Sequence, residues 1–593
     1  APERVTDWTA ANQQLLVAEF ARLRALLGDE ARPGEAEAQI TLARSLMPAP
    51  PAIDTLAELF QLSPFERDLL LLCAGVEMDA HLSALCAQAG ATQRTWASFG
   101  LALAALPDAH WSALSPDAPL RRWRLLEPEE GASLVNARLK IDERVLHYLA
   151  GINRLDYRLQ ALLQPVPQDA PPLSAAQSAG VQRLLTQWPA LRQAIVLEGD
   201  DGHGQRDAAA ALAAALGAEL YQLHGMDIPG DAAEQAAFAA LWGREAALLG
   251  AGLLLQCEGA SPEQQAASLR LARRLPGLVL LAGRDWPASD LPCHRLRIDP
   301  PEAPERRALW LAALDDLDMP IAAPALDNLA TQYRLGARRI AEIAEQARAH
   351  SPGADGATLQ RIARQEAARS AALPALAQTV APQAGWPALV LPAAQQQLLR
   401  QIVAHARHRL TVHHAWGFAD QGARGLGLAT LFWGDSGTGK TLAAEVMAHE
   451  LGLALVRVDL SAVVSKYIGE TEKNLRRVFD AAEAAGALLL FDEADALFGK
   501  RTEVRDSHDR YANIEVSYLL QRMEAYSGLA ILTSNHKAAL DPAFQRRLRF
   551  VVHFPFPDQE QREGIWRAVF PGAAPLAADL DFARLARLDA TGG

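Results

Sequence analysis

The most informative stretch of the sequence is Gly434-Asp435-Ser436-Gly437-Thr438-Gly439-Lys440-Thr441. It fits the pattern G-x-x-x-x-G-K-[ST], a loop whose backbone N–H groups wrap the phosphates of a nucleoside triphosphate. Residues 429–433 before it are typical of a short buried strand, and residues 442–451 after it are typical of a helix. Strand, loop and helix in this order predict that all eight residues of the loop bind a nucleotide.

Length and composition predict a globular protein of several domains. The chain has 593 residues, which is more than one hydrophobic core organises, so we expect three or four domains. Half of the residues are apolar and 21% are charged, which is a globular composition. The net charge of −13 argues against a nucleic-acid partner, because neutralising phosphates requires a basic face.

Cysteine usage and hydropathy predict a soluble, cytoplasmic protein. The four cysteines are scattered without metal-ligand spacing, which favours buried thiols in a reducing compartment. No apolar run reaches 18 residues, so no membrane span is expected. Residues 1–4 contain no apolar signal region.

The first part of the chain, residues 1–165, is predicted to be a helical docking or adaptor domain. Its apolar residues recur at helical spacing, and a capping box with a proline at the first helical position, Ser63-Pro64-Phe65-Glu66, begins one of the helices. Plain helical packing without a docking role is the alternative interpretation. The proline-rich stretch 164–172 is the expected linker to the next domain.

Two α/β modules are predicted to follow, at residues 173–375 and 387–593. Strand-like and helix-like runs alternate in both, which is the pattern of a parallel sheet with helical crossovers. The stretch between them, roughly 373–387, is rich in proline and alanine. The expected fold class is therefore a helical N-terminal domain followed by two α/β modules.

The phosphate-binding stretch has an altered copy upstream, which reads Gly199-Asp200-Asp201-Gly202-His203-Gly204-Gln205-Arg206. An offset of 235 positions carries Lys440 onto Gln205, and the same offset carries Asp492 onto Cys257. One ungapped offset that joins two motifs predicts two homologous modules.

The upstream copy lacks the chemistry of the downstream one. A lysine ammonium neutralises phosphate charge, whereas Gln205 is neutral. A hydroxyl and a carboxylate hold Mg²⁺, whereas Arg206 and Cys257 are poor ligands for this hard cation. We therefore expect no ATP hydrolysis in the first module and favour a structural or allosteric role. Weak nucleotide binding stays open, because Arg206 is able to contact a phosphate.

In the second module, residues 488–493 form an apolar run that ends in two carboxylates. The carboxyl end of a buried parallel strand lies beside the phosphate-binding loop. Asp492 and Thr441 are therefore predicted to hold Mg²⁺, and Glu493 is predicted to orient or deprotonate the attacking water. The predicted cofactors are ATP and Mg²⁺.

These motifs together resemble the AAA+ ATPases of the AAA clade. The resemblance is strong over residues 387–593 and degenerate over 190–350, and it implies P-loop modules with parallel sheets and small helical lids. It implies that Asn535, at the end of the next strand, senses the γ-phosphate. It also implies that the second lid begins at about residue 556 and is incomplete, with the intact unit extending beyond Gly593.

The same resemblance implies that the active site lies between subunits. Arg546 and Arg549 match the family's two arginines that reach a neighbouring subunit's γ-phosphate. Arg547 and Leu548 stand where the family has Pro-Gly, which leaves open which arginine acts. Arginines supplied by a neighbour imply a homo-oligomeric ring, most simply a hexamer.

Two further segments resemble the family's pore loops and imply a protein substrate. Lys466, Tyr467, Ile468 and Gly469 match the first pore loop, whose aromatic residue grips a polypeptide in the ring channel. The charged run 500–510 resembles the second pore loop. In the first module, Ala232 falls at the position of Tyr467, so this module lacks the gripping residue.

Within the clade, residues 63–76, 465–475 and 491–513 resemble bacterial ATPases found with phage-tail-like contractile injection systems. The resemblance implies an ATP-driven protein remodeller or unfoldase that threads a polypeptide through its pore, serving the assembly of such a particle or the loading of its cargo. The alternative is a nucleotide-switched assembly or docking protein without threading activity. A nucleic-acid motor is disfavoured by the net charge and by Tyr467.

Overall fold

The computed structural model of the protein divides into two compact units. Residues 1–170 and 177–299 form the first unit, and residues 171–176 and 300–593 form the second. The structure describes residues 7–28, 33–89, 94–131, 133–168, 173–191, 193–287, 289–350, 356–370, 377–409, 412, 416, 427–460, 470–494, 517–535, 546–570, 574, 576, 580–588 and 591.

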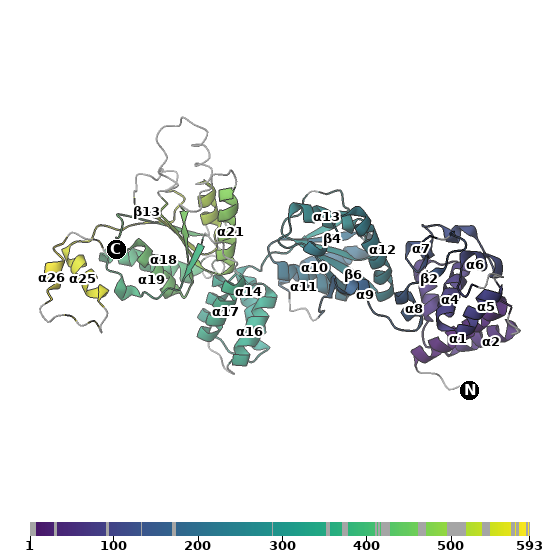
Figure 1. The fold of residues 1–593 in the computed structure, drawn as a ribbon. Helices are drawn as coiled ribbons and strands as arrows, with labels where there is room; N and C mark the ends of the chain where they lie inside the picture. Colours follow the sequence, from purple (N-terminus) through teal and green to yellow (C-terminus); the bar gives the residue numbers. More distant parts are fainter. Residues whose placement is uncertain are drawn as a thin grey trace, which may run out of the picture. The chain divides into compact units, whose positions relative to one another are not determined.

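The first unit begins with a helical domain around a leucine-rich core (Figure 1). The predicted capping box is confirmed, because the Ser63 hydroxyl accepts from the Glu66 amide and the Glu66 carboxylate accepts from the Ser63 amide. A short antiparallel hairpin joins Leu126–Pro128 (β1) to Leu139–Ile141 (β2). The helices are α1 Trp8–Leu26, α2 Pro33–Leu46, α3 Ala52–Phe60, α4 Pro64–Met78, α5 Ala80–Ala89, α6 Phe99–Ala105, η1 Trp111–Leu114, α7 Pro119–Arg122, α8 Glu143–Leu149 and α9 Tyr157–Gln160.

The rest of the first unit is an α/β module with a six-stranded sheet in the order β3-β5-β6-β7-β4-β8. All neighbours are parallel except β3, which pairs antiparallel with β5. The strands are β3 Leu163–Pro165, β4 Ala194–Glu198, β5 Glu219–His224, β6 Ala251–Gln256, β7 Val279–Gly283 and β8 Cys293–Arg297. The helices are α10 Ala175–Leu191, α11 Gly202–Ala215, η2 Gly225–Asp227, α12 Ala232–Leu249 and α13 Pro262–Ala272. The last residues of the predicted N-terminal domain therefore supply an edge strand to this sheet.

Buried ion pairs join the N-terminal domain to α12 of the first module. Arg244 is fully buried, and its guanidinium contacts the Asp156 carboxylate at 2.6 Å. Glu245, also fully buried, accepts from Arg144 at 2.9 Å. The Asn153 amide donates to the carbonyl of Leu248 at 2.8 Å. Breaking a buried pair leaves an uncompensated charge, so these contacts fix the two parts to each other.

The second unit begins with four helices, α14 Ala303–Asp315, α15 Ala323–Gln332, α16 Ala337–His350 and α17 Gly356–Ser370. The sequence places them at the end of the predicted first module, but they pack against the second one. Arg334 pairs with Glu483 at 3.0 Å, and the Gln332 side chain donates to the carbonyl of Leu451 at 3.2 Å. Gly486 adopts a φ of +59°, and a Cβ there would lie 2.1 Å from the Gln332 carbonyl oxygen. This contact therefore requires glycine.

The second module repeats the topology of the first, with a sheet in the order β14-β10-β13-β12-β11-β9. Its edge strand β9 is antiparallel to β11, and all other neighbours are parallel. The strands are β9 Ala377–Val380, β10 Leu428–Trp433, β11 Leu455–Asp459, β12 Leu488–Asp492, β13 Leu529–Ser534 and β14 Phe550–His553. The helices are η3 Trp386–Ala388, α18 Ala393–Arg407, α19 Lys440–Leu451, α21 Glu470–Ala484, α25 Gln559–Val569 and α26 Phe582–Leu585. The predicted fold class, a helical region followed by two α/β modules, is confirmed.

Among the described residues, no single helix is long and apolar enough to cross a membrane. The pair α4 and α5, bent by 118°, meets the criteria of length and composition only when taken together. Most of α4 is buried in the core of the N-terminal domain.

Candidate functional site

The loop between β10 and α19 has the backbone of a phosphate cradle. Gly434, Gly437 and Gly439 adopt φ values of +152°, +79° and +94°, which L side chains rarely reach. A Cβ on Gly434 would lie 2.1 Å from the Phe554 carbonyl oxygen, so this first glycine lets the loop pass beside the end of β14. The Thr438 hydroxyl donates to the Asp435 carbonyl at 2.8 Å and closes the turn. The local sequence thus folds into an open loop at the start of a helix, where backbone N–H groups bind anions.

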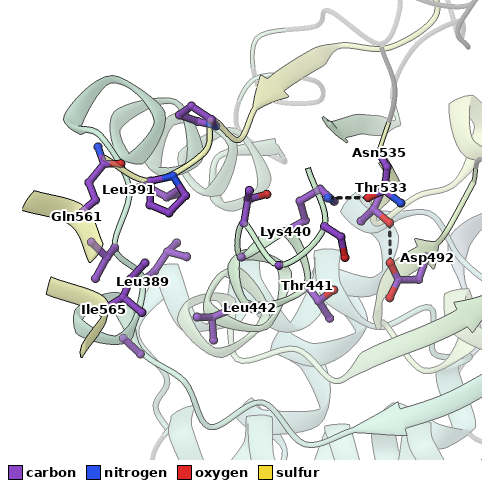
Figure 2. Close-up of a pocket in the computed structure, with 18 of the residues that line it drawn as sticks. Leu389, Leu391, Lys440, Thr441, Leu442, Asp492, Thr533, Asn535, Gln561 and Ile565 are labelled. Atoms are coloured by element: carbon purple, nitrogen blue, oxygen red, sulfur yellow. Dashed lines mark hydrogen bonds between the residues drawn. The ribbon is translucent and has the colours of Figure 1, made fainter. Parts of the chain in front are cut away.

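Lys440 is the first residue of α19, and its ammonium is held above this loop. It donates to the carbonyl oxygens of Gly434 at 2.6 Å and Asp435 at 2.8 Å. A third bond runs to the Asn535 side-chain oxygen at 3.0 Å, just beyond the end of β13. The lysine and the asparagine that the sequence singled out therefore lie together (Figure 2).

The carboxylates at the end of β12 lie beside the loop, and they have different surroundings. Asp492 is 8% exposed and accepts from the Thr533 hydroxyl at 2.6 Å. Its other oxygen is held by Arg457 of β11, at 3.0 Å from Nε and 2.7 Å from Nη2. The parallel register of β11, β12 and β13 brings these three residues to one sheet edge.

Glu493 follows directly and is exposed. Its φ of +56° is left-handed, which a residue with a side chain adopts only where its surroundings enforce it. Its amide donates to the Thr533 hydroxyl at 3.2 Å. The hydroxyl of Thr533 thus bonds both to the Asp492 side chain and to the backbone of the next residue, and this fixes how the strand ends.

These residues share one cavity of about 560 Å³. Figure 2 shows Lys440, Asp492 and Asn535 on one side of it, and Leu389, Leu391 and Ile565, together with Gln561, on the other. The apolar side is formed by Leu389 and Leu391 before α18, and by Ile565 of α25. This size and this mixture of linings are typical of a small-molecule site. The lining includes Leu389, Val390, Leu391, Ser436, Gly437, Thr438, Gly439, Lys440, Thr441, Arg457, Asp492, Glu493, Thr533, Asn535, Gln561 and Ile565.

Several of these residues were missed by the sequence analysis. The apolar residues at 389–391 and on α25 carry no motif, and they reach the loop only through the tertiary fold. Arg457 and Thr533 lie within strands and carry no motif. Alternation along a strand indicates only which face of the sheet a side chain is on, and their contact with Asp492 depends on strand order and register.

The remaining predicted site residues lie elsewhere or outside the described part. Arg546 and Arg549 are exposed just before β14 and do not line the cavity. Arg547, also exposed, lies 3.8 Å from the Glu524 carboxylate. Residues 466–469 and 500–510, which were predicted to form the two pore loops, lie outside the described residues.

The donor set at the loop fits a hydrated divalent cation. The Thr441 hydroxyl and the Asp492 carboxylate both face the cavity, and oxygen donors of this kind suit Mg²⁺. Among the described residues, the Arg457 guanidinium contacts Asp492, and the Arg457 side chain is 47% exposed. The guanidinium is therefore able to move into solvent when a ligand takes its place beside the carboxylate.

The fold and the loop define a P-loop nucleotide-binding module. Residues 430–558 match the model of the ATPase family associated with various cellular activities, abbreviated AAA. The chain therefore carries an AAA ATPase domain, as its sequence motifs predicted. Two further models match other parts: a variant winged helix domain over residues 6–163, and the helical domain of contractile injection system ATPases over residues 302–370.

These two matches follow the observed architecture. The second corresponds to the four helices α14 to α17, and the first covers the N-terminal domain with its β1–β2 hairpin. The helical periodicity of that domain predicted helices only, and the winged helix type was not predicted from it. The resemblance to contractile injection system ATPases is supported by an independent segment of the chain, because none of the stretches first compared lies within residues 302–370.

Curated relatives are similar to about a quarter of the chain. A cell division cycle protein 48 homolog of Archaeoglobus fulgidus is 34% identical over 162 residues, covering 27% of this chain and 22% of the relative. A proteasome-activating nucleotidase of Methanopyrus kandleri is 34% identical over 165 residues, 27% of this chain and 38% of the relative. An uncharacterised AAA family ATPase of Sinorhizobium fredii is 40% identical over 130 residues, 22% of this chain and 39% of the relative. The chain thus spans less than half the length of these relatives.

Proposed function

We propose that the second module binds ATP with Mg²⁺ and hydrolyses it, and that it does so in a homo-oligomeric ring that remodels a protein substrate. The observation that carries this proposal is the cavity of about 560 Å³, with the phosphate loop and two carboxylates on one side and an apolar surface on the other. A nucleoside triphosphate has the same division, with charged phosphates and a flat base. The base is assigned to the apolar side, beside Leu389 and Ile565.

Each polar residue has a role that its surroundings support. The Lys440 ammonium is held by two carbonyls and the Asn535 amide oxygen, so it exchanges neutral acceptors for phosphate oxygens when nucleotide binds. Thr441 and Asp492 would hold Mg²⁺, which supplies neutralisation of phosphate charge when bound. Asn535, beside the lysine, is placed to contact the terminal phosphate.

Glu493 is proposed as the residue that orients and deprotonates the attacking water. Its carboxylate is exposed within the cavity lining, unlike that of Asp492, which is committed to Arg457 and Thr533. The left-handed backbone at this residue turns the chain away from the strand direction, so two consecutive carboxylates have different surroundings. A free carboxylate beside a bound triphosphate is the group required for general base catalysis.

The comparisons support a protein substrate and a particle partner. One relative bears the name proteasome-activating nucleotidase, and residues 302–370 match a domain of contractile injection system ATPases. We therefore infer that the chain acts on a polypeptide and serves a contractile injection particle, in its assembly or its cargo loading. We also infer a ring, a hexamer by resemblance to the family, and the exposed position of Arg546 and Arg549 outside the lining of their own cavity supports it.

The test is the Glu493→Gln variant, assayed for ATP binding and for phosphate release. Removal of the base is expected to lower turnover by about a hundredfold or more while ATP binding persists, because the side-chain shape is kept. Glu263→Gln makes the same chemical change at an exposed carboxylate in the first module and should leave turnover unchanged. Normal phosphate release by Glu493→Gln would exclude the assignment of this residue.

The alternative function, a nucleotide-switched docking protein without threading, is favoured by one observation. The N-terminal domain, which matches a winged helix model, is fixed to the first module by buried ion pairs, as a docking platform would be. The Tyr467→Ala variant separates the two functions. Under the remodelling proposal it keeps basal ATPase activity and loses ATP-dependent unfolding of a client, whereas no ATP-dependent unfolding by either the wild type or the variant would favour docking.

A further inference from the structure

In the first module, residues that align with the phosphate loop belong to helix α11 instead of forming an open loop. With the offset of 235 positions, Gly202 corresponds to Gly437, yet α11 begins at Gly202 whereas α19 begins only at Lys440, three positions later in register. Gly202 and Gly204 have helical backbone, while Gly437 and Gly439 have φ values of +79° and +94°. The residues that form the open cradle in the second module thus form an extra helical turn in the first.

A carboxylate of the chain itself occupies the start of this turn. Asp201, which is 6% exposed, accepts from the Gly204 amide at 2.8 Å and is the N-cap of α11. The Gln177 side chain donates to its second oxygen at 3.3 Å. Gly204 corresponds to Gly439, so one of the amides expected to face a phosphate is already bonded to an anionic group. The Asp201 carboxylate therefore occupies the position expected for a phosphate.

Further carboxylates crowd the same loop. The Glu258 carboxylate lies so close to Gly202 that a Cβ there would be 2.6 Å from one of its oxygens. The Asp200 amide donates to an Asp299 oxygen at 3.1 Å, and the Asp200 carboxylate pairs with Arg284 at 2.5 Å. Arg284, which stands where the second module has its asparagine, is thus engaged by an acidic residue. Asp201 and Glu258 therefore place negative charge beside the loop, which opposes an incoming triphosphate, while Arg284 is already paired with Asp200.

Gln205 and Cys257, at the positions of Lys440 and Asp492, keep the packing of the loop but lack the charged groups that bind phosphate and Mg²⁺. The Gln205 amide donates to the carbonyls of Gly199 at 2.9 Å and Gly283 at 3.3 Å, so it joins loop and sheet as Lys440 does but without charge. Cys257, at the position of Asp492, is buried with its sulfur 3.0 Å from the Ser268 hydroxyl. Burial raises the pKa of this thiol, which keeps it protonated at neutral pH and unsuited to Mg²⁺.

We propose that the first module takes no nucleotide and is a permanently ordered platform for the N-terminal domain, with the Asp201 carboxylate standing in for a phosphate. In the first module the helical turn and its cap are built from the chain's own residues, so neither requires a ligand. The platform face is α12, whose buried Arg244 and Glu245 hold the N-terminal domain. The first unit then keeps one shape while the second module passes through its nucleotide states.

The test is the stoichiometry of nucleotide binding to the full chain, measured by isothermal titration with ADP and with a non-hydrolysable ATP analogue in the presence of Mg²⁺. One nucleotide per chain is expected, and the Lys440→Ala variant should lose it. Two nucleotides per wild-type chain, or a full site that survives Lys440→Ala, would overturn the inference. No binding at all would remove the proposed function of the second module while agreeing with an empty first module, so the two failures are distinguishable.

A second variant tests the wound loop itself. In the Lys440→Ala background, the changes Gln205→Lys and Arg206→Thr restore the residue types of an active loop but leave Asp201 in place. Nucleotide binding is expected to stay absent, because the amides remain committed to the helix and its cap. Saturable binding of one nucleotide by this variant would show that the first module lacked only the lysine and threonine side chains. That result would contradict the proposal that Asp201 occupies the phosphate position. Circular dichroism of the same sample verifies that the chain is folded.

Discussion

At the level of single residues, the structure adds an ion pair that no sequence motif predicts. Arg457 of β11 holds the Asp492 carboxylate with two nitrogens, at 3.0 and 2.7 Å. A guanidinium here supplies positive charge beside the carboxylate that we assign to Mg²⁺, so the arginine and the ion compete for one group. The sequence predicted Asp492 from its place after an apolar run, but Arg457 depended on which strand neighbours β12 and in which register.

This competition leads to a prediction for Arg457→Ala. Without the guanidinium, the Mg²⁺ concentration that gives half-maximal nucleotide binding is expected to fall, by up to about fivefold for a pair that is partly exposed and screened by water. A magnesium titration of a fluorescent nucleotide measures it. Arg457→Lys keeps a cation and should retain most of the wild-type requirement. An unchanged midpoint in Arg457→Ala would show that the pair does not oppose metal binding.

At the scale of elements, local signals predicted local features well. The strand before the loop, the helix after it and the capping box at Ser63 depend on neighbouring residues, and they lie within about two residues of their predicted places. The wound turn at Gly202 was not predicted, because the glycines that permit an open loop also permit a helix. Attachment of α14 to α17 to the second module was not predicted either, since it rests on contacts such as Arg334 with Glu483.

Gly486 provides a test of that attachment. Gly486→Ala forces a Cβ to within 2.1 Å of a backbone oxygen of Gln332, at a left-handed φ of +59°. We expect a loss of stability in the second unit of roughly 1–2 kcal/mol from the backbone strain, and further loss from the displaced helices. Thermal denaturation measures the loss, and faster proteolytic release of residues 300–370 should accompany it.

The matched control is Gly452→Ala in the same unit. Gly452 has a similar φ of +69°, but a Cβ there meets only the flexible end of the Gln360 side chain at 3.4 Å. It therefore carries the backbone strain without the backbone clash. Equal destabilisation by the two variants would mean that the contact between Gly486 and Gln332 does not hold the helices in place.

At the scale of the whole molecule, the repeat was predictable because one offset of 235 positions joins two motifs. The structure gives both sheets the same strand order, with an antiparallel strand at the same edge. What sequence reasoning did not reach is the division into units, which falls at residue 300 and separates the first sheet from the four helices that follow it. That division depends on which surfaces pack against each other, and a local sequence motif does not predict such packing. The two modules also differ at the phosphate loop, which is open at Gly437 and helical at Gly202.

A ring with one working site per chain makes a prediction about mixed assemblies. Arg546 and Arg549 are exposed and do not line their own cavity, so under the ring proposal they act on a neighbouring site. Replacing the acting arginine by alanine is expected to lower turnover about a thousandfold or more. Arg547→Ala, at a residue near Glu524, should leave turnover close to wild type and is the control.

Mixing then distinguishes action in trans from a structural role. A chain with Glu493→Gln supplies intact arginines, and a chain with Arg546→Ala or Arg549→Ala supplies an intact Glu493. In an equimolar mixed ring, roughly a quarter of the interfaces combine both intact halves, because heterologous contacts repeat around the ring. ATPase activity should therefore recover from near zero toward about a quarter of the wild-type rate for the arginine that acts across the interface. If neither arginine variant recovers on mixing with Glu493→Gln, each site draws all its catalytic groups from its own chain.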